Sequence, residues 1–114
     1  MGLDVVLYRL LHSGSGRRRS SSYTTVQVVA DPHDVLVGLL QRVRGGGRTP
    51  LLDRLDPGGE LVVAVEQVPG LLAELRWLGE LTVSPAEAEQ VRRLVALARR
   101  CLRDHDVALR FEGD

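Results

Sequence analysis

The segment from Ser84 to Asp106 constrains the fold more than any other, because it predicts a long helix with one apolar face. Ser84 is a good helix cap, Pro85 fits the first helical position, and Glu87 stands where it would complete a capping box. The apolar positions at helical spacing are Val91, Leu94, Val95, Ala98, Cys101 and Leu102. Such a helix has to bury its apolar face against other elements, so the chain is expected to build a layered core around it.

Four shorter segments have the composition of β-strands. Residues 3–11 carry apolar side chains on both faces, which predicts an interior strand, and residues 23–30 are β-branched and aromatic. One face of this second segment would carry Thr24, Val26, Val28 and Ala30. Residues 61–65 are entirely apolar and predict a short central strand, whereas residues 107–112 alternate and predict a half-exposed last strand.

Two further helices are predicted between these strands. The first, over residues 31–44, has Asp31 as its cap and an apolar stripe of Leu36, Leu39, Leu40 and Val43. Val35 and Val37 widen this stripe, so part of the helix would be covered by another element or by another subunit. The second helix begins near Pro69 and would bury Leu71, Leu72, Leu75 and Leu78.

The predicted order of elements is β-β-α-β-α-α-β. It implies a single α+β domain over residues 1–114, with a four-stranded mixed or antiparallel sheet packed by two to three helices. Residues 12–22 would form a flexible hairpin loop rich in arginine, serine and glycine. No apolar run approaches the roughly 20 residues that span a membrane. With a single cysteine and no secretory signal, we expect a cytoplasmic protein with no membrane partner.

The abundance of arginine is weak evidence for a functional role of these residues. The chain has no Lys, Asn or Ile, and all fifteen basic residues are Arg, which indicates a bacterial genome of high G+C content rather than selection for arginine. The net charge of zero does not favour nucleic acid as the main partner. Residues 1–54 carry a net +4 and residues 55–114 a net −4, an asymmetry that fits head-to-tail association or a simple spread over one surface.

The hairpin loop is the main candidate site for phosphate groups, and the arginines of the last predicted helix, interpreted as a solvated face, are the alternative second one. Arg17, Arg18 and Arg19 at its tip could contact the phosphates of a nucleic acid. The loop lacks the lysine and the following helix of a nucleotide-binding P-loop. It also lacks the interleaved aromatic residues that stack on bases. A solvated loop tip is the preferred interpretation, with nucleic-acid contact as the alternative.

The sequence offers no recognisable catalytic or metal-binding set. His12, His33 and His105 do not share an element at ligand spacing, and Cys101 lies on an apolar stripe where burial is expected. The carboxylates near Glu87 are explained by helix capping and by pairing with arginine. We therefore predict no cofactor and no metal, and an enzyme without a visible motif remains an alternative.

Trp77, Val35 and Val37 are the candidates for a protein interface. Trp77 falls outside the apolar stripe of its helix, where a tryptophan packs either at the edge of the core or against a partner. The functional hypothesis is a non-enzymatic protein-interaction or regulatory module that acts as a homodimer or with another protein. A nucleic-acid-binding accessory domain that uses the arginine loop is the alternative.

Overall fold

The computed structural model describes residues 3–13, 20–56, 58–104 and 106–113, and of residues 11–13 and 20–22 it describes the backbone alone. The elements are β1 (Leu3–Ser13), β2 (Ser20–Val29), α1 (Val35–Val43), β3 (Glu60–Val63), α2 (Val68–Glu80), α3 (Pro85–Arg103) and β4 (Val107–Gly113). Short 3₁₀ turns precede α1, β3 and α2. The predicted α+β class and the order of its elements are confirmed.

The four strands form one antiparallel sheet in the order β2-β1-β4-β3. The interior position predicted for the first strand is confirmed. The predictions for the third and fourth strands were wrong. The strand β3 was expected to be central and is an edge. The strand β4 was expected to be half-exposed, but it is central and largely buried on both faces. Strand order depends on pairings between segments far apart in the chain, and neither segment's own pattern contains that information.

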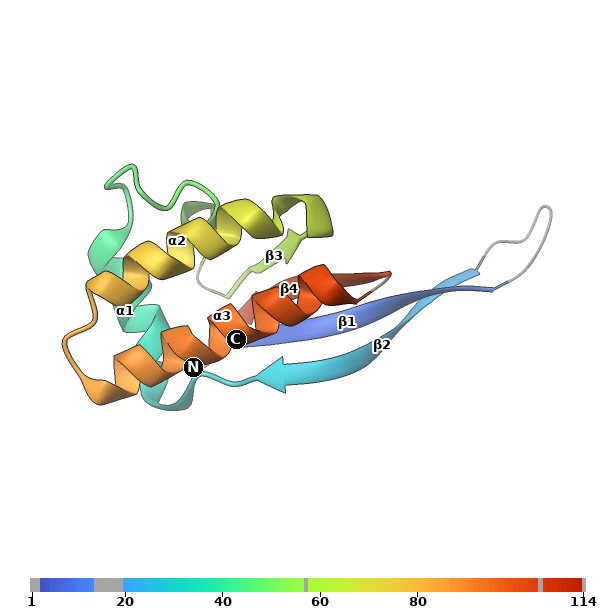
Figure 1. Ribbon diagram of the computed structural model, residues 1–114, viewed down its shortest axis with the longest axis horizontal. Helices are drawn as coiled ribbons and strands as arrows, with labels where there is room; N and C mark the ends of the chain where they lie inside the picture. The colour runs from blue at the N-terminus through green and yellow to red at the C-terminus, as the bar shows by residue number, and fades with distance from the viewer. Residues whose placement is uncertain (1–2, 14–19, 57, 105, 114) are drawn as a thin grey trace.

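All three helices pack on one side of the sheet, and α3 passes in front of the strands in Figure 1. The main core joins Leu7, Leu109 and Phe111 of the sheet to Leu36 and Leu39 of α1 and to the four leucines predicted for α2. The apolar stripe of α3 is largely confirmed, with one change. Leu97 is buried and Leu102 is exposed, because α3 is covered both by the sheet and by α2, which shifts its buried face.

The hairpin between β1 and β2 has longer strands than predicted. Residues 12 and 13 pair with residues 21 and 20, so the expected loop over residues 12–22 was too long at both ends. Backbone pairing needs no apolar side chain, and this is why the serine-rich segment could not be recognised as strand. Residues 14–19, with Arg17, Arg18 and Arg19, lie outside the described residues. The hairpin extends past β4, whose pairing with β1 ends at Arg9 (Figure 1).

The start of α1 differs from its prediction. His33 and Asp34 adopt left-handed conformations, with φ of 62° and 54°, so the α-helix begins at Val35 and not at Pro32. Asp31 still caps it: its two carboxylate oxygens accept hydrogen bonds from the backbone N–H groups of Leu36 (2.7 Å) and Val37 (3.1 Å). Burial raises the pKa of the Asp31 carboxyl, and these hydrogen bonds oppose the shift.

Candidate functional site

The side of the sheet that faces away from the helices carries an unusual set of residues. Val6, Tyr8 and Ala108 form a small buried cluster of their own there, separate from the main core. An antiparallel sheet with one solvated face normally alternates between apolar and polar residues, whereas β1 is apolar on both sides. We call this side the open face. Its centre is the buried cluster, with Arg110 next to it on β4.

Arg110 is held on the open face by two tyrosine rings. Its guanidinium carbon lies 5.2 Å from the ring centroid of Tyr8 and 4.8 Å from that of Tyr23, and the two rings meet edge to face at 5.7 Å. Glu112 forms an ion pair with the same guanidinium. A side-chain hydrogen bond to Tyr23 is the main cause that raises the pKa of Arg110. The arginine is therefore charged, and its position is constrained by two aromatic rings and an ion pair.

A β-bulge in β2 brings Tyr23 onto this face. The register shifts between Leu7 and Tyr8, so that Leu7 faces Gln27 while Tyr8 faces Thr25. Without the extra residue, Tyr23 and Val28, five positions apart, would point to opposite faces. The predicted common face of Thr24, Val26, Val28 and Ala30 was therefore wrong: Val26 packs toward the main core, and Val28 lies opposite Val6 of the open face.

Exposed apolar side chains gather on the open face. Of the eight large hydrophobic residues that the described part of the chain exposes, four lie there: Leu10, Tyr23, Val28 and Val62, each 38–54% exposed. Val28, Val6, Arg110 and Val62 form one row across all four strands. Contiguous exposed apolar surface on a rigid sheet is typical of a surface that another molecule covers.

An acidic row borders this apolar surface. Asp4, Glu112 and Glu60 lie side by side on three neighbouring strands, one step along the sheet from Arg110. Glu60 also contributes to raising the pKa of Tyr8, although burial is the larger cause. The open face thus combines an apolar surface, one central arginine and an acidic border.

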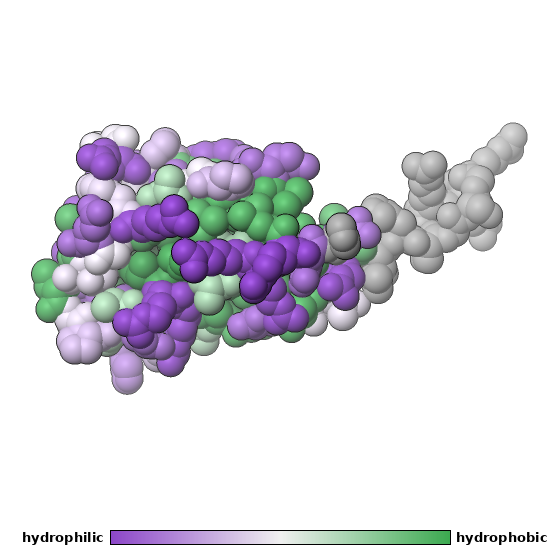
Figure 2. Space-filling view, viewed as in Figure 1, coloured by the Kyte–Doolittle hydropathy of each residue, from purple (hydrophilic) through white to green (hydrophobic). Residues whose placement is uncertain are grey.

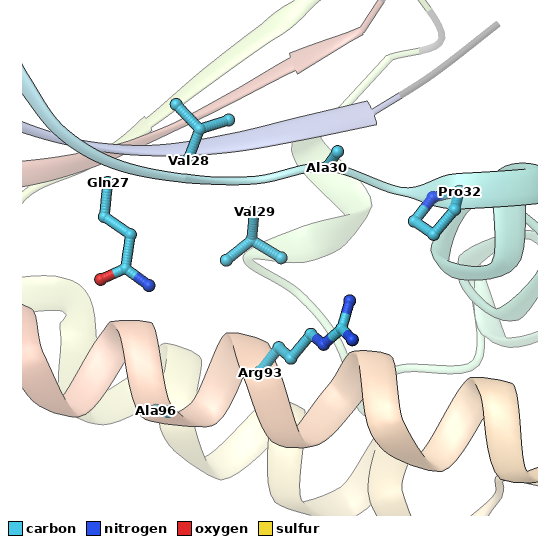
Figure 3. A pocket seen from close by; sticks show the side chains of 7 residues that line it. All are labelled: Gln27, Val28, Val29, Ala30, Pro32, Arg93 and Ala96. Carbon is cyan, nitrogen blue, oxygen red and sulfur yellow. The ribbon is translucent and has the colours of Figure 1, made fainter.

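A second candidate surface is a groove between β2 and α3, with a volume of about 450 Å³. Figure 3 shows it from close by, with the side chains of its lining residues: Gln27, Val28, Val29, Ala30, Pro32, Arg93 and Ala96. Two hydrogen bonds tie the strand to the helix on either side. Gln90 Nε2 donates to the carbonyl of Ala30 (2.7 Å), and Arg100 donates to the side-chain oxygen of Gln27 (2.7 Å).

The residues predicted to form an interface occupy other places. Val37 and Trp77 are partly buried against the main core, and Val35 is half-buried at the start of α1. The guanidinium of Arg48 covers the ring of Trp77 at 5.0 Å. The core-edge interpretation of Trp77 fits this packing. The open face was not recognised in the sequence, because the apolar residues on both faces of β1 were fully explained by an interior strand.

The groups considered for chemistry are held in structural contacts. Cys101 is fully buried, and burial, followed by the nearby charge of Asp104, raises the pKa of its thiol, which disfavours the reactive thiolate. Ser84 accepts the expected hydrogen bond from the N–H of Glu87, but the Glu87 carboxylate accepts from Val83 rather than closing the capping box. Within the described residues, no group of three or more His, Cys, Asp or Glu side chains could hold a metal ion.

Comparisons with protein families, with curated proteins and with solved structures gave no match for this chain. Among the described residues, no helix is both long enough and apolar enough to cross a membrane.

Proposed function

We propose that this chain is a non-enzymatic protein-interaction module that binds a partner protein through the open face of its sheet. The observation that carries the proposal is the row of apolar residues around Arg110, which none of the helices in the described part of the chain covers. Tyrosine and arginine are enriched where protein interfaces gain most of their binding energy. Here Tyr8 and Arg110 stand on the two central strands, and the exposed Tyr23 stands on the adjoining edge strand β2.

Pre-organisation strengthens this proposal. A flexible arginine loses conformational freedom when it binds, and this loss reduces affinity. Arg110 is already confined between two rings and an ion pair, so a partner would meet a fixed cation beside exposed valine and tyrosine side chains. The acidic border adds a charge pattern that would select the orientation of a partner.

The alternative function is nucleic-acid binding. It is supported by the arginines of α3, where Figure 2 shows hydrophilic side chains along the helical side of the molecule. Several of these cations are already paired: Glu89 contacts both Arg92 and Arg93, and Asp104 contacts Arg100. Pairing lowers the charge left for phosphates. We therefore prefer the protein partner.

The test compares three baits, the wild type and two variants, in affinity capture from the native lysate with and without nuclease treatment. The open-face variant replaces Val28 and Val62 with Ser, and the control variant replaces two exposed apolar residues elsewhere, Val83 and Leu102, with Ser. We expect the wild type and the control to retain the same protein, and the open-face variant to lose it. Equal retention by all three baits would contradict the proposal. A capture that nuclease abolishes would support the nucleic-acid alternative.

A further inference from the structure

The edge strand β2 lacks charge and proline, two of the features that usually prevent an edge from pairing with another chain. Its ten residues, SSSYTTVQVV, include no charged residue and no proline, in a chain of which 26% of the residues are charged. The opposite edge strand, β3, has only four residues and begins with Glu60. Long uncharged edges accept additional strands. The bulge interrupts β2 near Val26 but leaves residues 27–29 in regular register with β1.

The hydrogen bonds of β1 show which backbone groups of β2 point outward. The N–H of Leu10 donates to the carbonyl of Asp106, next to β4, at 2.7 Å. Because N–H groups alternate between the two sides of a strand, even-numbered residues of β1 bond toward β4 and odd-numbered residues bond toward β2. The residues of β2 that lie opposite odd-numbered partners are therefore the ones that bond to β1.

These bonded residues are Gln27 and Val29, so Val28 between them directs its N–H and C=O toward the outer edge. Ala30, two residues after Val28, should also direct its carbonyl away from β1. Its carbonyl does so, because it accepts the hydrogen bond from Gln90 of α3. Val28 thus offers one backbone donor and one acceptor beside the groove between β2 and α3.

The groove suits the side chains of an added strand. Figure 3 shows Arg93 reaching up from α3 toward β2, while Ala96, one turn further along the helix, leaves space next to Val29. The side chains of an added strand that point to the helical side of the sheet would lie over these two residues. One wall is therefore apolar, and the other carries the guanidinium of Arg93, whose only ion-pair partner among the described residues is Glu89, a carboxylate that Arg92 shares.

We propose that an extended, acidic segment of a partner protein adds to β2 as a fifth strand, bonded to the backbone of Val28, with a carboxylate side chain beside Arg93. This mode of recognition takes affinity from backbone hydrogen bonds and specificity from the neighbouring side-chain pockets. The site shares Val28 with the open face, but it uses the backbone of this residue together with α3, whereas the open face uses the side chains around Arg110.

Charge favours an acidic segment over a second copy of this chain. The residues of α3 include five arginines and two glutamates, a net +3. If two copies paired through β2, their α3 helices would be brought toward each other across the two-fold axis, and these like charges would repel. The strand β2 has no charged residue that could compensate. An acidic segment places opposite charge at the same position.

Two pairs of variants isolate the site. Val28→Pro removes the outward N–H without touching a hydrogen bond to β1, and Val28→Thr keeps this N–H and the branched side chain. Arg93→Glu reverses the charge in the groove, and Arg92→Glu makes the same change at a neighbour that pairs with the same Glu89 but does not line the groove. Circular dichroism checks the fold of each variant. If Val28→Pro does not fold, the comparison of Arg93→Glu with Arg92→Glu tests the proposal by itself.

The probe is a phage-displayed library of random linear dodecapeptides, selected on the immobilised wild-type protein. Enriched peptides are synthesised, and their binding is measured by fluorescence anisotropy. We expect sequences rich in β-branched residues with at least one Asp or Glu. Their affinity should fall by about tenfold or more with Val28→Pro and with Arg93→Glu, and should change less than about threefold with the two controls.

Three outcomes would overturn the proposal. The first is that no peptide is enriched, or that enriched peptides bind Val28→Pro and Arg93→Glu as well as they bind the wild type. The second is enrichment of basic peptides. The third is a wild-type dimer in sedimentation equilibrium that Val28→Pro dissociates, because the occupant of the edge would then be a second copy.

Discussion

The two faces of the sheet carry similar apolar side chains but differ in what covers them. On one face, Leu7, Leu109 and Phe111 are buried under three helices. On the other, Val6 and Tyr8 are buried only by their neighbours within the sheet, and the residues around them stay exposed. The comparison shows that burial in this chain has two origins. The covered face holds the fold together, and the open face leaves part of its apolar surface exposed, where we propose that a partner binds.

The largest effect on the free energy of unfolding is expected from a substitution on the covered face. Phe111→Ala should lower the free energy of unfolding by about 3–5 kcal/mol, because it removes a fully buried ring and leaves a cavity. A smaller truncation on the open face, Val62→Ala, should cost less than about 1 kcal/mol, since this side chain is already half exposed. Urea denaturation of both variants measures the two costs. Similar costs at the two positions would show that the open face stabilises the fold as much as the covered face does.

A smaller effect is expected from the contact between Arg110 and Tyr23. A double-mutant cycle with Arg110→Met and Tyr23→Leu should give a coupling energy of about 1 kcal/mol, the size typical of a partly shielded cation over an aromatic ring. The control cycle combines Arg110→Met with Leu102→Ala on the other side of the sheet, where the two costs should simply add. A coupling no larger than that of the control would mean that Arg110 is not held by the ring.

The smallest effect is expected where polar contacts tie the helices of the covered face together. Arg42 of α1 holds Glu87 of α3 through two hydrogen bonds of 2.7 and 3.0 Å, and this lowers the pKa of Glu87 to about 2. A carboxyl with a lowered pKa in the folded state stabilises the fold above its unfolded value of 4.5. This stabilisation is lost as the pH falls toward 2.

Glu87→Gln should therefore flatten the dependence of stability on pH between about 4.5 and 2. Arg42→Gln should flatten it in part, because the hydrogen bond from the N–H of Val83 to Glu87 remains. The measurement is the free energy of unfolding at several pH values in this range. Parallel profiles for the wild type and Glu87→Gln would show that the ion pair does not stabilise the folded state.

Much of the fold could be predicted from local patterns. The stripe of α3, the leucines of α2 and the interior position of β1 are visible in the sequence, because side-chain periodicity directly reflects which face of an element is buried. The start of α1 was missed because two non-glycine residues, His33 and Asp34, adopt left-handed conformations. Such conformations are uncommon outside glycine and leave no pattern to read.

The open face and the groove could not be predicted from local sequence patterns. The open face requires that β1 and β4 be neighbours and that a bulge turn Tyr23 toward Arg110. The groove requires that Arg93 lie across from an edge strand more than sixty residues earlier in the chain. Each depends on pairings at long range, and a single-residue shift in register would move every side chain of a strand to the opposite face.

The sequence by itself determined the α+β class, the number and order of the main elements and most of the residues that face the core, since these follow from local periodicity and capping. Only the tertiary structure decided the strand order, which strands are edges, and which apolar residues the helices leave uncovered. The physical reason is that the same apolar pattern is compatible with a strand buried under a helix and with a strand whose face stays exposed. The neighbours that distinguish the two cases come from distant parts of the chain.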